Sequence, residues 1–361
     1  MQIYFDNAAT TPPLPNLSGN FFGNPSSPHS LGRAAERELF TARQFFAKTF
    51  KCNTSNIFFT SGGTESNNIA LIGYALAHQR KNLTIMAQPW EHPSILQPLK
   101  YIKDNGLAEV LIAPYDNWNL CTTENRLAAI SHVNHETGDI NDISSIAKSL
   151  NNTKIMVDGV QGFCKEEIDL TPVDIYTFSA HKCHGPTGIG GLMSKTKLTP
   201  LLYGGDQEGT LRPGTENVQG IMAMVTAVQY IRENKTNHHS YVATIKAKLE
   251  ELTQELPGIV INTAGNKLSP YILNMSFLGL KGETLVHLLS ERSVYASMGA
   301  ACRSRKNIKS TLEVMGFPPE VANSAVRFSF SHLNTLAEAT TAKDIIIECV
   351  TRLRKMLGVK I

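Results

Sequence analysis

The sequence predicts an α/β fold in which a mainly parallel sheet forms a large domain and a smaller α+β domain follows it. From residue 30 to about 200, short β-rich runs alternate with helical patterns, which is typical of βαβ units. After about residue 243 the pattern changes to long amphipathic helices around a few strands. Polar or glycine-rich residues follow nearly every expected strand, as they do at the ligand-binding edge of a parallel sheet. We expect a large domain at 13–242 and a small domain at 243–361 that also includes 1–12.

The expected elements follow from the spacing of apolar residues. The strands of the large domain are short apolar runs at 56–60, 83–88, 109–114, 127–133, 154–159, 173–179 and 190–195. Helical spacing appears at 33–50, 64–79, 141–150, 219–233 and 239–256. In the small domain we expect helices at 281–291 and 335–357, a strand at 271–277, and a strand-like run around Arg327.

Composition is that of an ordinary globular protein. The chain has 361 residues, of which 42% are hydrophobic and 18% charged, and a net charge of +3 from intermixed basic and acidic residues. This balance gives no reason to expect nucleic acid or an acidic membrane as a partner. The first residues lack a secretory signal, and no apolar run approaches the roughly 18 residues that a membrane span needs. The six cysteines form no CxxC pair, so we expect reduced thiols and a cytoplasmic protein.

The stretch "TSGGTESNN" at 60–68 joins a strand to a helix through two glycines and a threonine. Exposed backbone amides at a helix N-terminus can bind a phosphate group. The stretch matches neither GxGxxG nor GxxxxGK[ST], so it indicates neither a dinucleotide nor a nucleoside triphosphate. The alternative is a tight turn with Thr64 as a helix cap.

Asp158 follows the apolar run "KIMV", where an unpaired carboxylate would be unfavourable. The pyridinium nitrogen of pyridoxal 5'-phosphate (PLP) would be a suitable partner. The alternative is a solvated or helix-capping aspartate.

Lys182 lies in "FSAHKCHGPTGIG", between His181 and the pair Cys183 and His184. These neighbours suggest zinc, but adjacent residues of an extended segment point to opposite faces and no second ligand cluster appears, so we expect no metal. A surface lysine is a second alternative. A lysine in a pocket at a strand end can instead form a Schiff base. Together, the phosphate loop, Asp158 and Lys182 indicate PLP.

Three further residues have both a functional and an ordinary interpretation. His92 in "WEHPSI" is either a strand-end histidine or a group that stacks on PLP and transfers protons. Cys302 in "SMGAACRSR" is either a structural cysteine or a thiolate favoured by neighbouring arginines. Arg327 is either a residue of an edge strand or a fork for a substrate carboxylate.

With these residues identified, the chain resembles the cysteine desulfurases of the NifS/IscS type, which are class V aminotransferase-like PLP enzymes. The resemblance extends from "YFDNAATTP" to "VRFSFS", which is most of the chain. It implies the fold type I (aspartate-aminotransferase-like) architecture of PLP-dependent transferases. The motifs occur in the family's order: "GNPSSPHSLGR", "FTSGGTESNN", "EHPSI", "NHETG", "VDGVQ", "FSAHKCHGPTGIG", "GGDQEGTLRPGTEN", "SMGAACRS" and "RFSFS".

The resemblance implies a role for individual residues. Lys182 would bind PLP covalently, His92 would stack on the ring and shuttle protons, and Cys302 would accept sulfur. Arg327 would bind the substrate carboxylate, with Asn134 as a further candidate. The remaining cofactor contacts implied by the family are Gly63, Thr64, His135, Asp158, Gln161, Ser179, His181 and Thr215.

Three features depart from the family pattern. His135 stands in "NHETG" where the family has asparagine, so a bulkier and titratable imidazole replaces that contact. The chain is also shorter than usual between "ATTPP" and "GNPSS", which leaves little room for the family's first helix. After the final helix it lacks the tail by which scaffold-serving members deliver sulfur, which disfavours iron–sulfur assembly as its specific role.

The implied activity is conversion of L-cysteine to L-alanine with a persulfide on Cys302, in a homodimer with shared active sites. Thr215 would reach the phosphate of the other subunit. The sulfur acceptor would be an iron–sulfur scaffold or a carrier for tRNA thiolation. The alternatives are a selenocysteine lyase, another fold type I lyase or aminotransferase, and a catalytically idle homologue that serves as a binding partner.

Overall fold

The computed structural model describes residues 2–17, 22–79, 82–298 and 309–359. The chain divides into two compact units. The large unit comprises Pro12–His132 and Asn141–Glu233, and the small unit comprises Met1–Thr11, Val133–Ile140 and Asn234–Ile361. No helix in the described ranges is long and apolar enough to cross a membrane.

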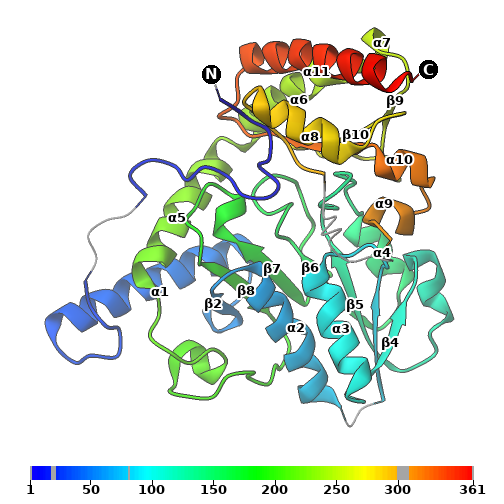
Figure 1. Ribbon diagram of the computed structural model, residues 1–361. Coiled ribbons are helices and arrows are strands. Elements are labelled where there is room, and N and C mark those ends of the chain that lie inside the picture. The colour runs from blue at the N-terminus through cyan, green and yellow to red at the C-terminus, as the bar shows by residue number, and fades with distance from the viewer. Residues whose placement is uncertain (1, 18–21, 80–81, 299–308, 360–361) are drawn as a thin grey trace. The chain divides into compact units, whose positions relative to one another are not determined.

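A 7-stranded sheet forms the centre of the large unit (Figure 1). The strands are β2 (Ile57–Thr60), β3 (Leu83–Ala87), β4 (Glu109–Ile112), β5 (Asn125–Ser131), β6 (Thr153–Asp158), β7 (Ile175–Ser179) and β8 (Gly190–Ser194). They lie in the order β2-β8-β7-β6-β5-β3-β4. Strand β8 is antiparallel to both neighbours, and all the other pairs are parallel. The parallel strands therefore end at a common edge, where ligands are expected.

Helices cover both faces of this sheet. They are α1 (Ser30–Phe50), α2 (Gly63–His78), α3 (Pro93–Asp104), α4 (Ile143–Ser149) and α5 (Val218–Glu233), with short 3₁₀ helices at Thr54–Asn56, Tyr115–Leu120, Ala180–Lys182 and Gln207–Thr210. Alternate residues of β5 belong to different apolar clusters. Ala128 and Ile130 pack with residues of α1, α4 and α5, whereas Leu127 and Ala129 pack with residues of α2 and α3. Burial on both faces explains why the strands are continuous apolar runs.

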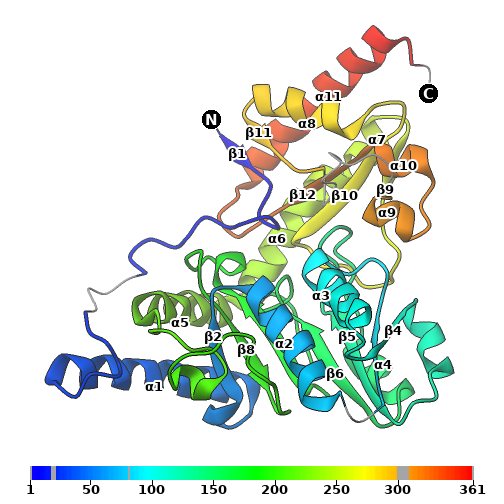
Figure 2. The ribbon, with the colours of Figure 1, turned by 60° about the horizontal axis from the view of Figure 1, so that its bottom comes forward.

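The small unit contains two sheets (Figure 2). Strands β9 (Ile259–Ile261), β10 (Ile272–Phe277) and β12 (Ala325–Ser329) form an antiparallel sheet with β10 in the centre. Strands β1 (Ile3–Tyr4) and β11 (Val294–Tyr295) form a parallel pair. The helices are α6 (Lys235–Glu250), α7 (Leu252–Glu255), α8 (Gly282–Glu291), α9 (Thr311–Val314), α10 (Pro319–Asn323) and α11 (Leu336–Leu357).

Local sequence explains where the last helix begins and ends. The side chain of Thr335 accepts the backbone N–H of Glu338, and the Glu338 carboxylate accepts the N–H of Thr335 in return. This capping box satisfies two helix-start donors. Gly358 caps the end of the helix with a φ of 64°, a left-handed conformation that glycine adopts without strain.

The predicted α/β class with a mainly parallel sheet is confirmed, and each predicted strand and helix corresponds to an observed one. Helix α3 was not predicted, because Pro98 lies inside it and Pro93 at its start, and proline in a helical run normally indicates a break. The helix expected at 239–256 begins earlier and is two helices, α6 and α7, which meet at Glu251.

The segment 133–140 lies in the small unit, although the sequence analysis placed it in the large domain. Val133 and Ile140 pair with each other and pack on Ile272. Asp139 accepts the backbone N–H groups of Ala264 and Gly265. These partners are distant in sequence, so the local pattern of 133–140 gave no sign of them.

Candidate active site

The candidate site of the large unit lies at the carboxyl ends of β6 and β7. Asp158 is the last residue of β6, and its register partner on β7 is Thr177. Strand β7 ends at Ser179, and Lys182 follows in the 3₁₀ helix Ala180–Lys182. The acidic residue and the lysine that the sequence singled out therefore come from adjacent parallel strand ends.

The carboxylate of Asp158 is buried and receives two neutral donors. Asp158 is only 7% exposed. Oδ2 accepts Nδ2–H of Asn67 at 2.8 Å, and Oδ1 accepts the backbone N–H of Val160 at 3.0 Å. A carboxylate oxygen can accept more than one hydrogen bond, so the acceptor capacity of Asp158 suits a protonated ring nitrogen.

Asn67 connects Asp158 to the start of α3. Its Nδ2 also donates to Ser94 Oγ at 2.8 Å, and its Oδ1 accepts the hydroxyl of Thr177 at 2.7 Å. Ser94 in turn contacts Nδ1 of His92, through Oγ at 2.8 Å and through its backbone N–H at 3.1 Å. The imidazole of His92 caps α3 and belongs to an exposed residue, whereas Asn67 is fully buried. Neither Asn67 nor Ser94 was predicted from the sequence, although Asn67 lies within the motif "TESNN" and Ser94 within "EHPSI".

The start of α2 has the features of a phosphate site. The capping residue Gly62 has no side chain to satisfy the first helical N–H groups, and its φ of 155° favours glycine. A Cβ on Gly63 would come within 2.5 Å of Val160, so the close approach there also requires glycine. The hydroxyl of Ser179 is buried without a hydrogen-bond partner in the described residues, 3.7 Å from the Cβ position of Gly62. An anion at this helix start would satisfy these donors.

His181 and Lys182 are both half-buried. Burial, together with the nearby charges of Lys182 and Lys165, lowers the pKa of His181 to about 4. His181 is therefore neutral at physiological pH and can donate one ring N–H to an acceptor.

Cys183 and His184 have structural partners. The thiol of Cys183 donates to the carbonyl of Phe163 at 3.4 Å, and Nδ1 of His184 lies 2.7 Å from the carbonyl oxygen of Pro12. In the ranges that the structure describes, no group of three or more His, Cys, Asp or Glu residues could hold a metal ion.

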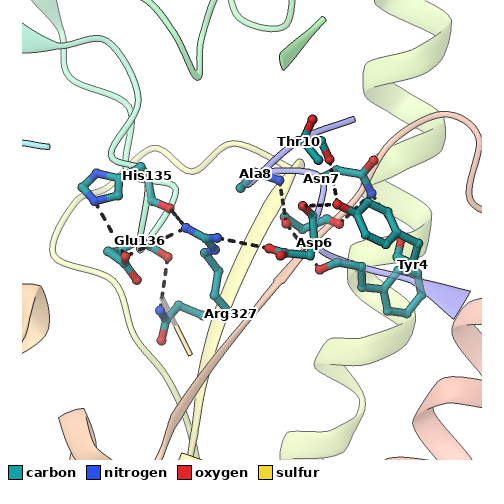
Figure 3. A network of polar contacts seen from close by, with 11 residues as sticks. Tyr4, Asp6, Asn7, Ala8, Thr10, His135, Glu136 and Arg327 are labelled. Atoms are coloured by element: carbon teal, nitrogen blue, oxygen red, sulfur yellow. Dashed lines mark hydrogen bonds and ion pairs between the residues drawn. The ribbon is translucent and has the colours of Figure 1, made fainter. Parts of the chain in front are cut away.

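In the small unit, Arg327 of β12 lies at the centre of a polar network (Figure 3). The residue is 6% exposed. Its NH1 donates to the carbonyl of His135 at 2.8 Å and lies 3.9 Å from Glu136 Oε1, and NH2 contacts Asp6 Oδ1 at 3.2 Å. Its Nε has no hydrogen-bond partner in the described residues. This environment fixes the guanidinium and leaves N–H donors, Nε among them, for a further acceptor.

The loop that carries Asn134 and His135 is held by its own contacts. Asn134 Oδ1 accepts the backbone N–H groups of Glu136 and Thr137, at 2.8 and 3.1 Å. The ring Nε2 of His135 lies 3.7 Å from Glu136 Oε1. Asn134 thus shapes the loop, and the side chain of His135 lies beside a buried carboxylate.

Three further predicted residues complete the description. Gln161 lies in the turn after β6. In the same turn, a Cβ added to Gly159 would lie 2.0 Å from the ring of Tyr176, so only glycine fits there. Thr215 is exposed in the segment before α5. Cys302 lies outside the described residues. The structure therefore groups Asp158, Ser179 and Lys182 in one unit and His135 and Arg327 in the other.

Comparisons with known proteins cover nearly the whole chain. The profile of the aminotransferase class-V family matches residues 3–341. A NifS/IcsS protein homolog from Lactobacillus delbrueckii subsp. bulgaricus is 37% identical, over 93% of this chain and 94% of that protein. Cysteine desulfurase IscS from Buchnera aphidicola subsp. Acyrthosiphon pisum is 33% identical, over 98% and 94%. A solved NifS-like protein superposes with a TM-score of 0.89 at 30% identity, over 98% of this chain and 100% of that one.

Proposed function

Because the chain belongs to the aminotransferase class-V family, we propose that it is a PLP-dependent cysteine desulfurase. In the reaction, the sulfur of L-cysteine passes to an enzyme thiol, giving L-alanine and a persulfide. The C–S bond of the substrate breaks and an S–S bond forms, and the hydrogen of the thiol ends on alanine, so no external oxidant or reductant is needed. The names and near full-length coverage of the curated relatives support this assignment.

The observation that carries the proposal is the set of groups at the strand ends of the large unit. The buried carboxylate of Asp158 fits the pyridine nitrogen of PLP. The buried hydroxyl of Ser179, which has no partner in the described residues and lies beside the glycine start of α2, fits the phosphate. Lys182, which follows shortly after the end of β7, fits the aldehyde. Neither a nucleotide nor a metal would need this combination. Bound PLP supplies an electron sink for the bonds at the substrate's α-carbon.

The protein's own side chains would bind PLP and orient it. Lys182 would hold the cofactor covalently, and Asp158 would hold a proton on its ring nitrogen. Ser179, with Gly63, Thr64 and His181, would bind the phosphate through neutral donors. The neutral state of His181 suits this role because its ring can donate without adding a charge. We assign Gln161 and His135 to the phenolic oxygen.

Arg327 would bind the substrate carboxylate, with Asn134 shaping the neighbouring loop. A guanidinium held by the carbonyl of His135 and by Asp6 is fixed before substrate arrives, which reduces the ordering that binding requires. His92 would stack on the ring and move protons, and the thiol of Cys302 would accept the sulfur.

The finer assignments are part of the same proposal. The chain would act as a homodimer in which Thr215 reaches the partner's phosphate, and it would pass sulfur to an iron–sulfur scaffold or a tRNA-thiolation carrier in the cytoplasm. The cysteines that the structure describes are all free thiols, as a reducing compartment requires. Selenocysteine is the alternative substrate.

The test is alanine formation from L-cysteine by wild type and by Cys302→Ala, with reductant present. We expect the variant to bind PLP but to make no alanine. In a separate sample treated with L-cysteine without reductant, which would remove the sulfur, we expect wild type to carry roughly 32 Da of added sulfur on the peptide that contains Cys302. Cys52→Ala is the matched control and should retain activity, because Cys52 is half-buried next to the apolar core. Wild-type alanine production by Cys302→Ala would replace the desulfurase assignment with a lyase or aminotransferase. Activity confined to selenocysteine would favour the lyase.

A further inference from the structure

A chain of polar side chains in the large unit runs from the buried Asp158 to the exposed His92. Its intermediate members are Asn67 on α2 and Ser94 in the first turn of α3, both buried. The contacts Asp158–Asn67, Asn67–Ser94 and Ser94–His92 each measure 2.8 Å. These two positions have no part in the cofactor contacts proposed above.

The orientation of the Asn67 amide is set by its neighbours. An ionised carboxylate only accepts hydrogen bonds, so the group 2.8 Å from Asp158 Oδ2 must be the amide nitrogen and not the oxygen. The amide oxygen then accepts the hydroxyl of Thr177, at 2.7 Å. With one hydrogen of Nδ2 on Asp158, the second points at Ser94 Oγ.

The same reasoning sets the direction at Ser94 and His92. Ser94 Oγ already accepts from Asn67, so its own hydrogen is available for Nδ1 of His92. The backbone N–H of Ser94 also donates to Nδ1, at 3.1 Å. A ring nitrogen that faces two donors carries no hydrogen, so the neutral imidazole has its proton on Nε2.

We propose that Asn67 and Ser94 are positioning residues that transmit the charge of Asp158 to His92 as a one-directional hydrogen-bond relay. Through this relay, Asp158 sets Nδ1 of His92 as the acceptor and Nε2 as the donor. The consequence for catalysis rests on the proposed function. Asp158 is assigned to the ring nitrogen of the cofactor and His92 to its face, and Asn67 would orient both. The relay itself depends only on the three contacts described above and is testable without cofactor or substrate.

The first measurement is the tautomer of His92 in the cofactor-free protein, by NMR of histidine labelled with nitrogen-15. The chain has 11 histidines, and His92→Gln identifies the signal by its loss. We expect a ring with hydrogen on Nε2. A ring with hydrogen on Nδ1 would overturn the proposal, because it would have to donate toward Ser94 and could not accept its backbone N–H.

The second measurement uses a side chain of the same size that replaces the hydrogen-bond donor of Asn67 with an acceptor. In Asn67→Asp, the introduced carboxyl offers Ser94 an acceptor, so the serine hydroxyl turns from His92 toward it. We expect the Nδ1 resonance of His92 to move in the same direction as in Ser94→Ala. The double variant should move it no further than the larger single change, because both act on one chain of contacts. Additive shifts would overturn the relay, as would an unchanged resonance in Asn67→Asp.

The matched control is Asn68→Asp, the same substitution at the next residue of α2. Asn68 Nδ2 donates to the carbonyl of Thr64 and makes no contact with the relay, so the His92 resonance should stay in place. PLP affinity provides a further readout. Asn67→Asp should weaken binding at least tenfold because two adjacent carboxyls compete for one proton, whereas Ser94→Ala should change it less than threefold. Unchanged affinity in Asn67→Asp would overturn the role of Asn67 at Asp158.

The outcomes separate the relay from the proposed activity. If wild type makes no alanine from L-cysteine but the tautomer and coupling are as described, the desulfurase assignment fails and the relay stands. If alanine forms and the coupling is absent, the reverse holds. If Asn67→Asp does not fold, the tautomer of His92 in wild type and the effect of Ser94→Ala still test the relay. Removal of the Ser94 hydroxyl must move the Nδ1 resonance of His92 if the relay exists.

Discussion

Glu91 is a buried carboxyl whose substitution should change how stability depends on pH. The residue is 3% exposed, and its two carboxyl oxygens lie 3.1 and 3.2 Å from the backbone N–H of Ser131. Burial, opposed by the Ser131 hydrogen bond and reinforced by the nearby charge of Asp158, raises the pKa of Glu91 to about 8. Glu91 is therefore protonated in the folded protein at neutral pH, and Glu91→Gln replaces a neutral acid with a neutral amide of the same shape.

The sign follows from proton binding. Between the ordinary pKa of 4.5 and the folded value of about 8, the folded chain holds a proton that the unfolded chain releases. The free energy of unfolding therefore falls as pH rises through this window, by about 3 kcal/mol at pH 7. Glu91→Gln has no such proton, so the variant should be nearly as stable as wild type at pH 5 and more stable by up to about 3 kcal/mol at pH 7.

The assay is urea unfolding of both proteins at pH 5, 6, 7 and 8, followed by circular dichroism. Glu124→Gln is the control, because Glu124 is an exposed carboxyl just before β5, and it should leave the wild-type pH dependence unchanged. If wild type and Glu91→Gln lose stability with the same pH slope, Glu91 is ionised in the folded protein and the reasoning is wrong. A variant that is less stable at every pH would show that the carboxyl makes a contact that an amide cannot replace.

Three further predictions concern the candidate site. Lys182→Ala should abolish turnover and the lysine-linked absorbance of bound PLP, and an active variant with unchanged absorbance would remove the lysine from its role. Arg327→Lys should raise the KM for L-cysteine at least tenfold with PLP absorbance intact, because an ammonium cannot contact a carboxylate as a fork; an unchanged KM would place the substrate carboxylate elsewhere. Gly159→Ala should destabilise the protein by about 2 kcal/mol or more, because its Cβ would overlap Tyr176, and thermal unfolding would measure the loss.

The repeating apolar pattern was sufficient to predict the large sheet. Strands such as β5 are buried on both faces, so their sequences are continuous apolar runs that stand out from the helices between them. Helix α3 was hidden by Pro98, whose missing N–H and ring are tolerated there but usually end a helix. The assignment of 133–140 to the small unit depends on Asp139 and its distant backbone donors, which no local pattern reveals.

The site was predictable where chemistry restricts the residue type. Asp158 and Lys182 stand out by their surroundings in the sequence, and in the structure they lie at or just after the ends of the adjacent parallel strands β6 and β7. Asn67 was not predicted, because an asparagine in a helical run normally faces solvent and its importance appears only when the buried partners are known. The surroundings of Cys302 stay a prediction from sequence alone, since the residue lies outside the described ranges.

The small unit is assembled from three separate stretches of chain. It therefore cannot be expressed or exchanged as one continuous fragment. Strand β1 near the start of the chain pairs with β11, and Asp6 and the carbonyl of His135 hold Arg327. A fragment cut at Asn234 would leave β11 without its parallel partner and Arg327 without either contact. Recombination that exchanged only the C-terminal third between relatives would likewise join an arginine from one parent to an aspartate and a loop from another. Such chimaeras would mix the residues that hold Arg327, so this unit can evolve by coordinated change in its three stretches of chain but not as a transferable module.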